Sequence, residues 1–316
     1  MSAKVARRSA SVLHFHSSTP FNTIQIFRKR QMKSYLELLT DVMQNGEGHD
    51  DRTGVGTRSV FGRQWRHDMS TGFPLLTTKK IPLRWVFEEL RWFLSGSTDV
   101  NDLQLAGVDI WDEWATAEQC GKFGRAAGNL GPVYGALWRE FPIGRWKGEG
   151  GEGSSDQIQS VLLDIINNPN SRRIICTGWH PYYQSQVALP PCHTLWQIKC
   201  HADNRMSLHL YARSIDIFLG LPFNIASYGM LLEMLCSVTG RTAKDLVISF
   251  GDLHLYNNHA AQAELQLSRD PHALPTVRLF RPTDETALKR LLAFQWQDVH
   301  LFGYEHHPKI EAEVAI

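Results

Sequence analysis

Hydrophobic positions in the first half of the chain recur at spacings typical of helices and of strands. YLELLTDVM at 35–43 has apolar residues at helical spacing, which predicts a helix followed by a polar, glycine-containing loop. RSVFGRQWRHD at 58–68 alternates apolar and polar residues, as a strand does. Pro82 should open an amphipathic helix, LRWVFEELRWFLS, that ends at Gly96. VDIWDEWA at 108–115 places two tryptophans three positions apart, the spacing of one helical face.

The second half of the chain repeats this mixture without a βαβ rhythm or an internal repeat. Apolar patterns predict helices at 156–169, 223–240 and 257–269, and strands at 171–179, 193–200, 205–214 and 246–256. The turn ADN between two of these strands indicates an antiparallel hairpin. Stretches 121–129 and 144–156 are interpreted as surface loops, because apolar pattern resumes directly after each. We therefore predict one α+β domain with a large mixed β-sheet and flanking helices.

Composition and charge narrow the classes of function. With 43% hydrophobic residues over 316 positions, the chain can bury a large core. Its apolar runs fall short of the roughly 20 residues that a membrane span needs. A net charge of +1 gives no general attraction for nucleic acid or an anionic membrane, so neither is expected as a partner. Five cysteines without metal-ligand spacing indicate thiols in a reducing, cytoplasmic environment, and no metal site is predicted.

Residues 1–31 differ from the rest of the chain, because they carry six basic residues and no acidic one. We interpret them as a basic, flexible N-terminal extension ahead of a single catalytic domain at 32–316. An organelle presequence is the alternative, which the lack of a clear apolar stripe at helical spacing disfavours.

The stretch LPPCHTLWQ places Cys192 at the mouth of a predicted strand, behind two prolines that stiffen its approach. An inert buried thiol is the ordinary explanation of such a residue, and a nucleophile in a cleft is the alternative. The adjacent His193 is a poor base for it, because neighbouring side chains of an extended segment point to opposite faces. The next strand ends at Arg213, where a hairpin would return a guanidinium that stabilises a thiolate. The sequence thus favours a cysteine nucleophile supported by arginine.

Arginines at loop or strand ends form a candidate site for a phosphate monoester, together with Ser214. They are Arg52, Arg172, Arg173 and Arg213. Rigid guanidinium forks bind phosphate well, and no glycine-rich phosphate loop accompanies them. Ordinary surface ion pairs are the alternative for each arginine taken alone.

Asn224 is a polar amide among apolar residues at the predicted start of a helix. It is either an N-cap or a reader of the uracil edge, to which an amide offers both a donor and an acceptor. His254 and Tyr256 alternate onto one face of a strand, where they suit a sugar hydroxyl. A metal is rejected there, because His254 and His259 lack a carboxylate at ligand spacing.

The aromatic residues Trp111, Trp114 and Tyr134 allow two interpretations. Burial in the core is the default for such side chains. As a flat, partly apolar wall they are equally suited to stack on a bicyclic heteroaromatic cofactor.

An ordered set of motifs carries a family resemblance. It comprises DRTGVGT, FPLLTTKK, EELRWFLSGSTDVNDL, IWDEWA, LGPVYG, SRRII, LPPCHTL, RSIDIFLGLPFNIASY, GDLHLYNNH, QLSRDP and the C-terminal VAI. From Met32 to Ile316 the chain resembles the folate-dependent thymidylate synthases that use a cysteine nucleophile. The resemblance implies a large mixed sheet and a homodimer packed sheet to sheet. It also implies the conversion of dUMP and 5,10-methylenetetrahydrofolate into dTMP and dihydrofolate, with the folate as one-carbon and hydride donor.

The resemblance also implies roles for individual residues. Cys192 matches the nucleophile that adds to C6 of the pyrimidine, and Asn224 matches the residue that selects uracil. The catalytic group comprises Cys192, Glu89, Tyr134, Arg213, Asn224 and Asp216. The dUMP-binding group comprises Arg52, Arg213, Ser214, Asp216, Asn224, His254 and Tyr256, with Arg172 and Arg173 donated by the partner subunit. The folate-binding group comprises Trp111, Trp114, Asp216, Gly220, Phe223 and Ile316.

Two residues depart from the family pattern, and a rival activity remains open. Ala212 stands where many members have glutamine, and His180 stands where asparagine is usual. The rival is a dUMP hydroxymethylase, in which water instead of hydride captures the methylene intermediate. Bulky residues at Trp111, Tyr134 and Ile316 match positions that close the cavity against water, which favours the synthase.

Overall fold

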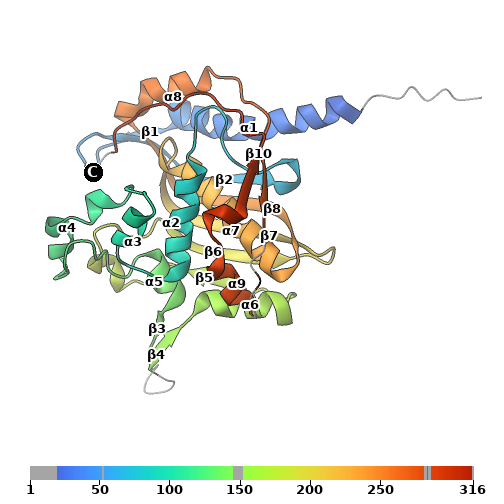
Figure 1. Cartoon of the computed structure of the whole chain (residues 1–316). Coiled ribbons are helices and arrows are strands. Elements are labelled where there is room, and N and C mark those ends of the chain that lie inside the picture. Colours follow the sequence, from blue (N-terminus) through green and yellow to red (C-terminus); the bar gives the residue numbers. More distant parts are fainter. Residues whose placement is uncertain (1–19, 52, 145–151, 281–282, 284–285, 315–316) are drawn as a thin grey trace, which may run out of the picture.

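The computed structural model describes residues 20–51, 53–144, 152–280, 283 and 286–314. A six-stranded sheet with the order β1-β2-β8-β7-β6-β5 forms its centre (Figure 1). The strands are β1 (Glu47–His49), β2 (Thr57–Asp68), β5 (Ile175–Thr177), β6 (His193–Cys200), β7 (Arg205–Asp216) and β8 (Thr242–Tyr256). β7 and β8 run parallel, whereas the other neighbouring pairs of this sheet are antiparallel. The predicted α+β class and mixed sheet are confirmed.

Helices and smaller strand pairs surround this sheet. The α-helices are α1 (Pro20–Asn45), α2 (Leu83–Ser95), α3 (Asn101–Leu105), α4 (Ala117–Gly121), α5 (Tyr134–Arg139), α6 (Gln157–Asn167), α7 (Gly220–Thr239), α8 (Ala260–Leu267) and α9 (Ala287–Ala293). Short 3-10 turns are η1 (Met69–Thr71), η2 (Asp112–Trp114), η3 (Tyr183–Gln186), η4 (Asn257–His259) and η5 (Trp296–Asp298). Two antiparallel pairs complete the fold: β3 (Phe141–Ile143) with β4 (Gly153–Ser155), and β9 (Thr276–Leu279) with β10 (Val299–Phe302).

Helix α2 has the boundaries that its sequence predicts. Pro82 occupies the N-cap, and Gly96 ends the helix in the left-handed conformation with φ 80°, its amide donating to the Phe93 carbonyl. The apolar side of α2 is buried in the core. Glu89 is buried with it, so this helix brings a carboxyl group into an apolar environment.

Helix α7 packs against β7 and β8 and fills the centre of the core. Its apolar residues lie all around its circumference, which is the pattern of a fully buried helix. Among the described helices, α7 has the length and apolar composition of a membrane span, but 78% of that span is buried inside the protein. A helix buried in a protein core also meets these criteria of length and apolar composition.

Strands β7 and β8 change their buried positions part-way along their length. The most deeply buried residues of β7 are even-numbered up to Ala212 and odd-numbered beyond Arg213, and β8 changes in the same way at Gly251. A Cβ on Gly251 would lie 2.6 Å from the Arg213 carbonyl oxygen, so only glycine allows this approach of the two strands. Beyond the change, even-numbered polar side chains of both strands become partly exposed.

Helix α1 differs from its sequence prediction at its start. It begins at Pro20, well before the 35–43 pattern, and its first part extends beyond the rest of the molecule in Figure 1. Residues 20–31 of the predicted extension are therefore helical, while residues 1–19 lie outside the described residues. The division of the chain at residue 31 stays a prediction.

Three other segments differ from the sequence predictions. The predicted loop 144–156 contains β4, which pairs with β3 in the hairpin at the bottom of Figure 1. The predicted strand 171–179 shortens to β5, and the helix 257–269 to η4 followed by α8. β9, α9 and β10 then follow, so the expectation that 257–269 is the final helix of the chain is wrong.

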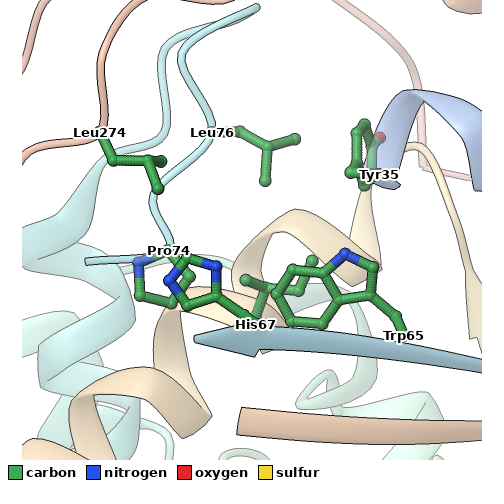
Figure 2. Close-up of a pocket in the computed structure, with 7 residues that line it drawn as sticks. Tyr35, Trp65, His67, Pro74, Leu76 and Leu274 are labelled. Atoms are coloured by element: carbon green, nitrogen blue, oxygen red, sulfur yellow. The ribbon is translucent and has the colours of Figure 1, made fainter. Parts of the chain in front are cut away.

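A small interior pocket lies where α1, β2 and α7 meet (Figure 2). It is lined by Tyr35, Trp65, His67, Pro74, Leu76, Ile225 and Leu274. His67 Nε2 lies 2.8 Å from the Gly72 carbonyl oxygen, and burial lowers the pKa of His67 to about 4. None of the lining residues belongs to the predicted site, so this pocket is a feature of the core.

Candidate active site

Cys192 lies directly before β6 and differs in burial from the other cysteines. Cys192 is partly exposed, whereas Cys120, Cys176, Cys200 and Cys236 are buried. Burial raises the pKa of the Cys176, Cys200 and Cys236 thiols, which keeps them protonated. Cys192 is therefore the cysteine that is accessible to a small molecule.

Arg213 is held beside Cys192 by the two prolines before it. Arg213 Nη2 lies 3.9 Å from Cys192 Sγ. Arg213 Nε donates to the Pro191 carbonyl and Nη2 to the Pro190 carbonyl, each at 2.9 Å. The backbone amide of Arg213 also donates to the Cys192 carbonyl at 2.9 Å. The hairpin thus returns a guanidinium to the sulfur, as the sequence argument predicts, and a cation at this position stabilises negative charge there.

His193 is buried, whereas the adjacent Cys192 is partly exposed. Its ring packs against Tyr134 and Tyr228, with centroids 5.1 and 5.2 Å away. Burial lowers the pKa of His193 to about 4, against the opposing effect of the Asn224 side chain. A neutral, buried ring is unsuited to activate Cys192, in agreement with the sequence argument.

Tyr134 lies against both Cys192 and Trp111, and Trp111 binds a buried carboxyl group. The amide of Cys192 donates to the Tyr134 hydroxyl at 2.8 Å, and burial holds the pKa of Tyr134 well above its usual value. Trp111, whose ring lies 6.0 Å from that of Tyr134, donates its indole N–H to Glu89 at 2.7 Å. Burial raises the pKa of Glu89 to about 7, while the bond from Trp111 lowers it. Glu89 can therefore exchange a proton near neutral pH.

The first turns of α7 bring further predicted residues together. α7 begins at Gly220, with Leu219 as N-cap, so Asn224 lies inside the helix and the N-cap alternative is wrong. A Cβ on Gly220 would lie 3.8 Å from both Asn224 Oδ1 and Asp216 Cβ. The Asp216 carboxylate accepts a hydrogen bond from the Phe218 amide at 2.8 Å. Asp216 and Asn224 thus flank Gly220.

The parallel pairing of β7 and β8 aligns the remaining polar residues. Ser214 is opposite Asp252, and Asp216 is opposite His254. The rings of His254 and Tyr256 meet edge to face, with centroids 5.3 Å apart. Ser214 and Asp216 follow Arg213 on β7. Like His254 and Tyr256 on β8, they occupy partly exposed positions.

A model of the thymidylate synthase family matches residues 33–316, which is nearly the whole described chain. The chain belongs to the thymidylate synthase family. Members of this family are methyltransferases that bind dUMP and use methylenetetrahydrofolate as co-substrate.

Some residues that the thymidylate synthase resemblance selects stand apart from the group around Cys192. Arg172 and Arg173 are exposed on the segment between α6 and β5, and no partner of either guanidinium group occurs among the described residues. Arg52 and Ile316 lie outside the described residues.

Two of the residues predicted for folate are in contact with each other, the buried Trp111 and the partly exposed Trp114. The rings of Trp111 and Trp114 meet edge to face at 6.0 Å. The indole N–H of Trp114 is buried and has no hydrogen-bond partner in the described part of the chain. Phe223 is partly buried and packs on the core. Aromatic faces with an unpaired donor fit a flat heteroaromatic ring.

Two charged residues of this region were missed by the sequence analysis. Lys79 is 4% exposed, donates to the Phe218 carbonyl at 2.5 Å and lies 3.5 Å above the Phe218 ring. Burial lowers the pKa of Lys79 to about 7, while Asp216 opposes the shift. A lysine directly after the apolar run of FPLLTT was the available signal. Asp252 is the second, and its signal was its position two residues before His254 on the same strand.

The two departures from the family pattern have defined places. His180 packs its ring against Phe141 and Tyr183, with centroids 5.4 and 4.7 Å away. Ala212 is fully buried in β7, opposite His193. His180 thus belongs to an aromatic group beside the hairpin of β3 and β4, since Phe141 is the first residue of β3.

Proposed function

We propose that this protein catalyses the thymidylate synthase reaction, in which dUMP and 5,10-methylenetetrahydrofolate give dTMP and dihydrofolate. The observation that carries the proposal is the guanidinium of Arg213 at 3.9 Å from the accessible thiol of Cys192, in a chain of this family. Uracil C5 is a weak carbon nucleophile, and covalent addition at C6 overcomes that weakness.

In the proposed mechanism the Cys192 thiolate adds to C6 of dUMP. The new S–C bond moves electron density to C5 and to the carbonyl at C4, which enables C5 to attack a one-carbon unit. Methylenetetrahydrofolate supplies that unit and the hydride that reduces it. Asn224 recognises the uracil edge with its amide. C5 then loses its proton, and the bond between the one-carbon unit and the folate nitrogen breaks, which leaves an exocyclic methylene on the ring. Transfer of the hydride to this methylene expels the sulfur from C6, so that dTMP and dihydrofolate form and the thiolate returns to its place beside Arg213.

Protons move near Glu89 and Tyr134 in this mechanism. A carboxyl group with a pKa of about 7 can both accept and donate a proton at neutral pH. Tyr134 stays a neutral hydroxyl, because burial raises its pKa. Its hydrogen bond from the Cys192 amide keeps the hydroxyl beside Cys192. We assign Glu89 to proton exchange with the ring through bound water.

The phosphate of dUMP is assigned to Arg213 and Ser214, with Arg52 from the same chain and Arg172 and Arg173 from a partner subunit. Two exposed arginines without a partner among the described residues support this arrangement. A fixed fork of donors suits a phosphate dianion. The site is then complete only in a homodimer.

The sheet itself supports a homodimer packed face to face. Leu195 and Tyr211 are opposite each other on β6 and β7, and Ile175 lies on neighbouring β5. Their exposed fractions are 38%, 39% and 43%, so an apolar patch lies open in the single chain. Such a patch marks an interaction surface. Ile175 follows closely after Arg172 and Arg173, so a second copy that covers the patch would bring these arginines near another subunit.

The folate is assigned to Trp111, Trp114, Phe223, Asp216 and Gly220, with Ile316 at the C-terminus. The aromatic side chains accept the ring system, and the Asp216 carboxylate accepts hydrogen bonds from its nitrogens. The buried indole N–H of Trp114 is available as a donor. No metal takes part in the proposed chemistry.

Low exposure around the reacting carbon favours reduction over hydration. Trp111 and Tyr134 are 5% and 4% exposed. Buried aromatic walls that keep bulk water away disfavour capture of the methylene intermediate by water, which is the hydroxymethylase outcome.

Incubation with dUMP and methylenetetrahydrofolate tests the proposal. We expect dTMP together with the absorbance rise of dihydrofolate. Hydroxymethyl-dUMP with tetrahydrofolate would instead identify the rival activity. Cys192→Ser should abolish turnover while dUMP still binds, and 5-fluoro-dUMP with the folate should leave an adduct on the Cys192 peptide. Wild-type turnover in Cys192→Ser would overturn the mechanism.

A further inference from the structure

Asp252 lies beside His254 on β8 without being part of the site assigned above. The two side chains approach to 2.7 Å, from Asp252 Oδ1 to His254 Nδ1. The His254 side chain is 12% exposed, and that of Asp252 is 45% exposed. The sheet register places Ser59 of β2 opposite His254. An acceptor thus holds one nitrogen of a largely buried imidazole.

Asp252 is ionised at neutral pH. Its pKa lies below the usual value, first because of the hydrogen bond with His254, while burial opposes the shift. The hydroxyl of Ser59 and the charge of His49 favour the ionised form as well. An ionised carboxylate only accepts hydrogen bonds. His254 Nδ1 therefore carries a proton.

A proton on Nδ1 is compatible with two forms of the ring: in the imidazolium both nitrogens donate, and the proposal concerns the neutral form. In a neutral imidazole with a proton on Nδ1, Nε2 is an acceptor. His254 Nε2 has no hydrogen-bond partner among the described residues. It is also absent from the fully buried unpaired atoms, so it keeps some exposure to solvent. Tyr256 meets the His254 ring edge to face, which fixes the ring plane further. A rigid acceptor of this type suits a hydroxyl donor.

We propose that Asp252 is a positioning residue for nucleotide recognition, which holds His254 in the tautomer whose Nε2 accepts the 3′-hydroxyl of the substrate sugar. The inference rests on the proposed function, because it requires a nucleotide with that hydroxyl at this site. Asp252 contacts the His254 imidazole and the Ser59 hydroxyl, and in this proposal it does not contact the nucleotide. It acts on binding and on the choice of sugar, and not on the chemical step.

The test compares dUMP with 2′,3′-dideoxyuridine 5′-monophosphate, which lacks the 3′-hydroxyl. We define the ratio as the Kd of the dideoxy nucleotide divided by the Kd of dUMP. In full-length Asp252→Ala this ratio should fall about tenfold relative to the wild type, which is the effect of one hydrogen bond. KM for dUMP should rise by a similar factor while kcat stays within about twofold. Asp252→Asn keeps an oxygen acceptor and should lie between the two proteins. Asp203→Asn, a change in an exposed turn where Asp203 pairs with Arg205, should leave the ratio unchanged.

A double-mutant cycle asks whether Asp252 acts through His254. The variant with both Asp252→Ala and His254→Ala should match His254→Ala alone, because the carboxylate then has no ring to hold. Long-range ¹H–¹⁵N spectra should show a proton on His254 Nδ1 in the wild type and a different tautomer distribution in Asp252→Ala. Additive effects, or unchanged discrimination in Asp252→Ala while His254→Ala loses it, would overturn the inference alone. A wild-type protein that fails to bind dUMP would overturn the proposed function and the inference with it.

Discussion

Replacing Trp111 by phenylalanine should raise the pKa of Glu89. The indole N–H donates to the buried carboxyl at 2.7 Å, and this bond opposes the effect of burial. A hydrogen bond to a charged group contributes about 1.5–3 kcal/mol, and one pKa unit corresponds to about 1.4 kcal/mol. Loss of the bond should therefore raise the pKa from about 7 by about one to two units. The carboxyl group would then be protonated at neutral pH.

Infrared titration of the free protein measures this shift directly. Glu89→Gln identifies the carboxyl band, and the midpoint is then compared between the wild type and Trp111→Phe. Trp114→Phe is a matched control, because the indole N–H of Trp114 has no partner among the described residues. An unchanged midpoint in Trp111→Phe would refute the reasoning. An equal shift in Trp114→Phe would refute it as well, since the effect would then come from altered packing.

Three further predictions concern stability and assembly. Gly251→Ala should destabilise the fold by about 1–3 kcal/mol, because its Cβ would lie 2.6 Å from the Arg213 carbonyl oxygen; a wild-type denaturation midpoint would contradict this. Burial lowers the pKa of His67 from 6.5 to about 4, so the unfolded chain binds a proton that the folded protein excludes. Stability should therefore fall by up to about 3 kcal/mol as the pH drops through this interval, and denaturation of His67→Asn should show a smaller loss, whereas equal slopes would exclude His67 as the cause. Mixed Arg172→Ala and Arg213→Ala chains should recover about a quarter of wild-type activity by random dimer exchange, and a mixture that stays inactive would argue against a shared site.

Long or strongly periodic segments of the fold were predictable from the sequence. Helix α2 follows the prediction at both ends, because Pro82 and Gly96 impose local backbone constraints that act without the rest of the fold. The hairpin of β6 and β7 follows from periodicity together with the turn ADN, and the central helix α7 follows from periodicity. β4, β9 and β10 are only three or four residues long, so tertiary pairing defines them more than sequence pattern does.

The candidate site was predictable where neighbouring strands determine it. The predicted hairpin places Arg213 beside Cys192, and strand alternation places His254 beside Tyr256. The N-cap alternative for Asn224 failed because α7 begins earlier than its apolar pattern, at Gly220. The states of Glu89, Lys79 and Asp252 depend on burial and on cross-strand partners, which no single segment of sequence contains.

The position of helix α7 should make the arrangement of the candidate site sensitive to the packing of the core. The helix that fills the interior also contains, in its first turns, Gly220 and Asn224, which lie beside Asp216. Because α7 is one continuous helix, a change in packing near its C-terminal end can shift Asn224 near its N-terminal end. Defects introduced deep in the hydrophobic centre should weaken turnover before they unfold the protein, so an activity measurement on this protein also reports on the integrity of its core.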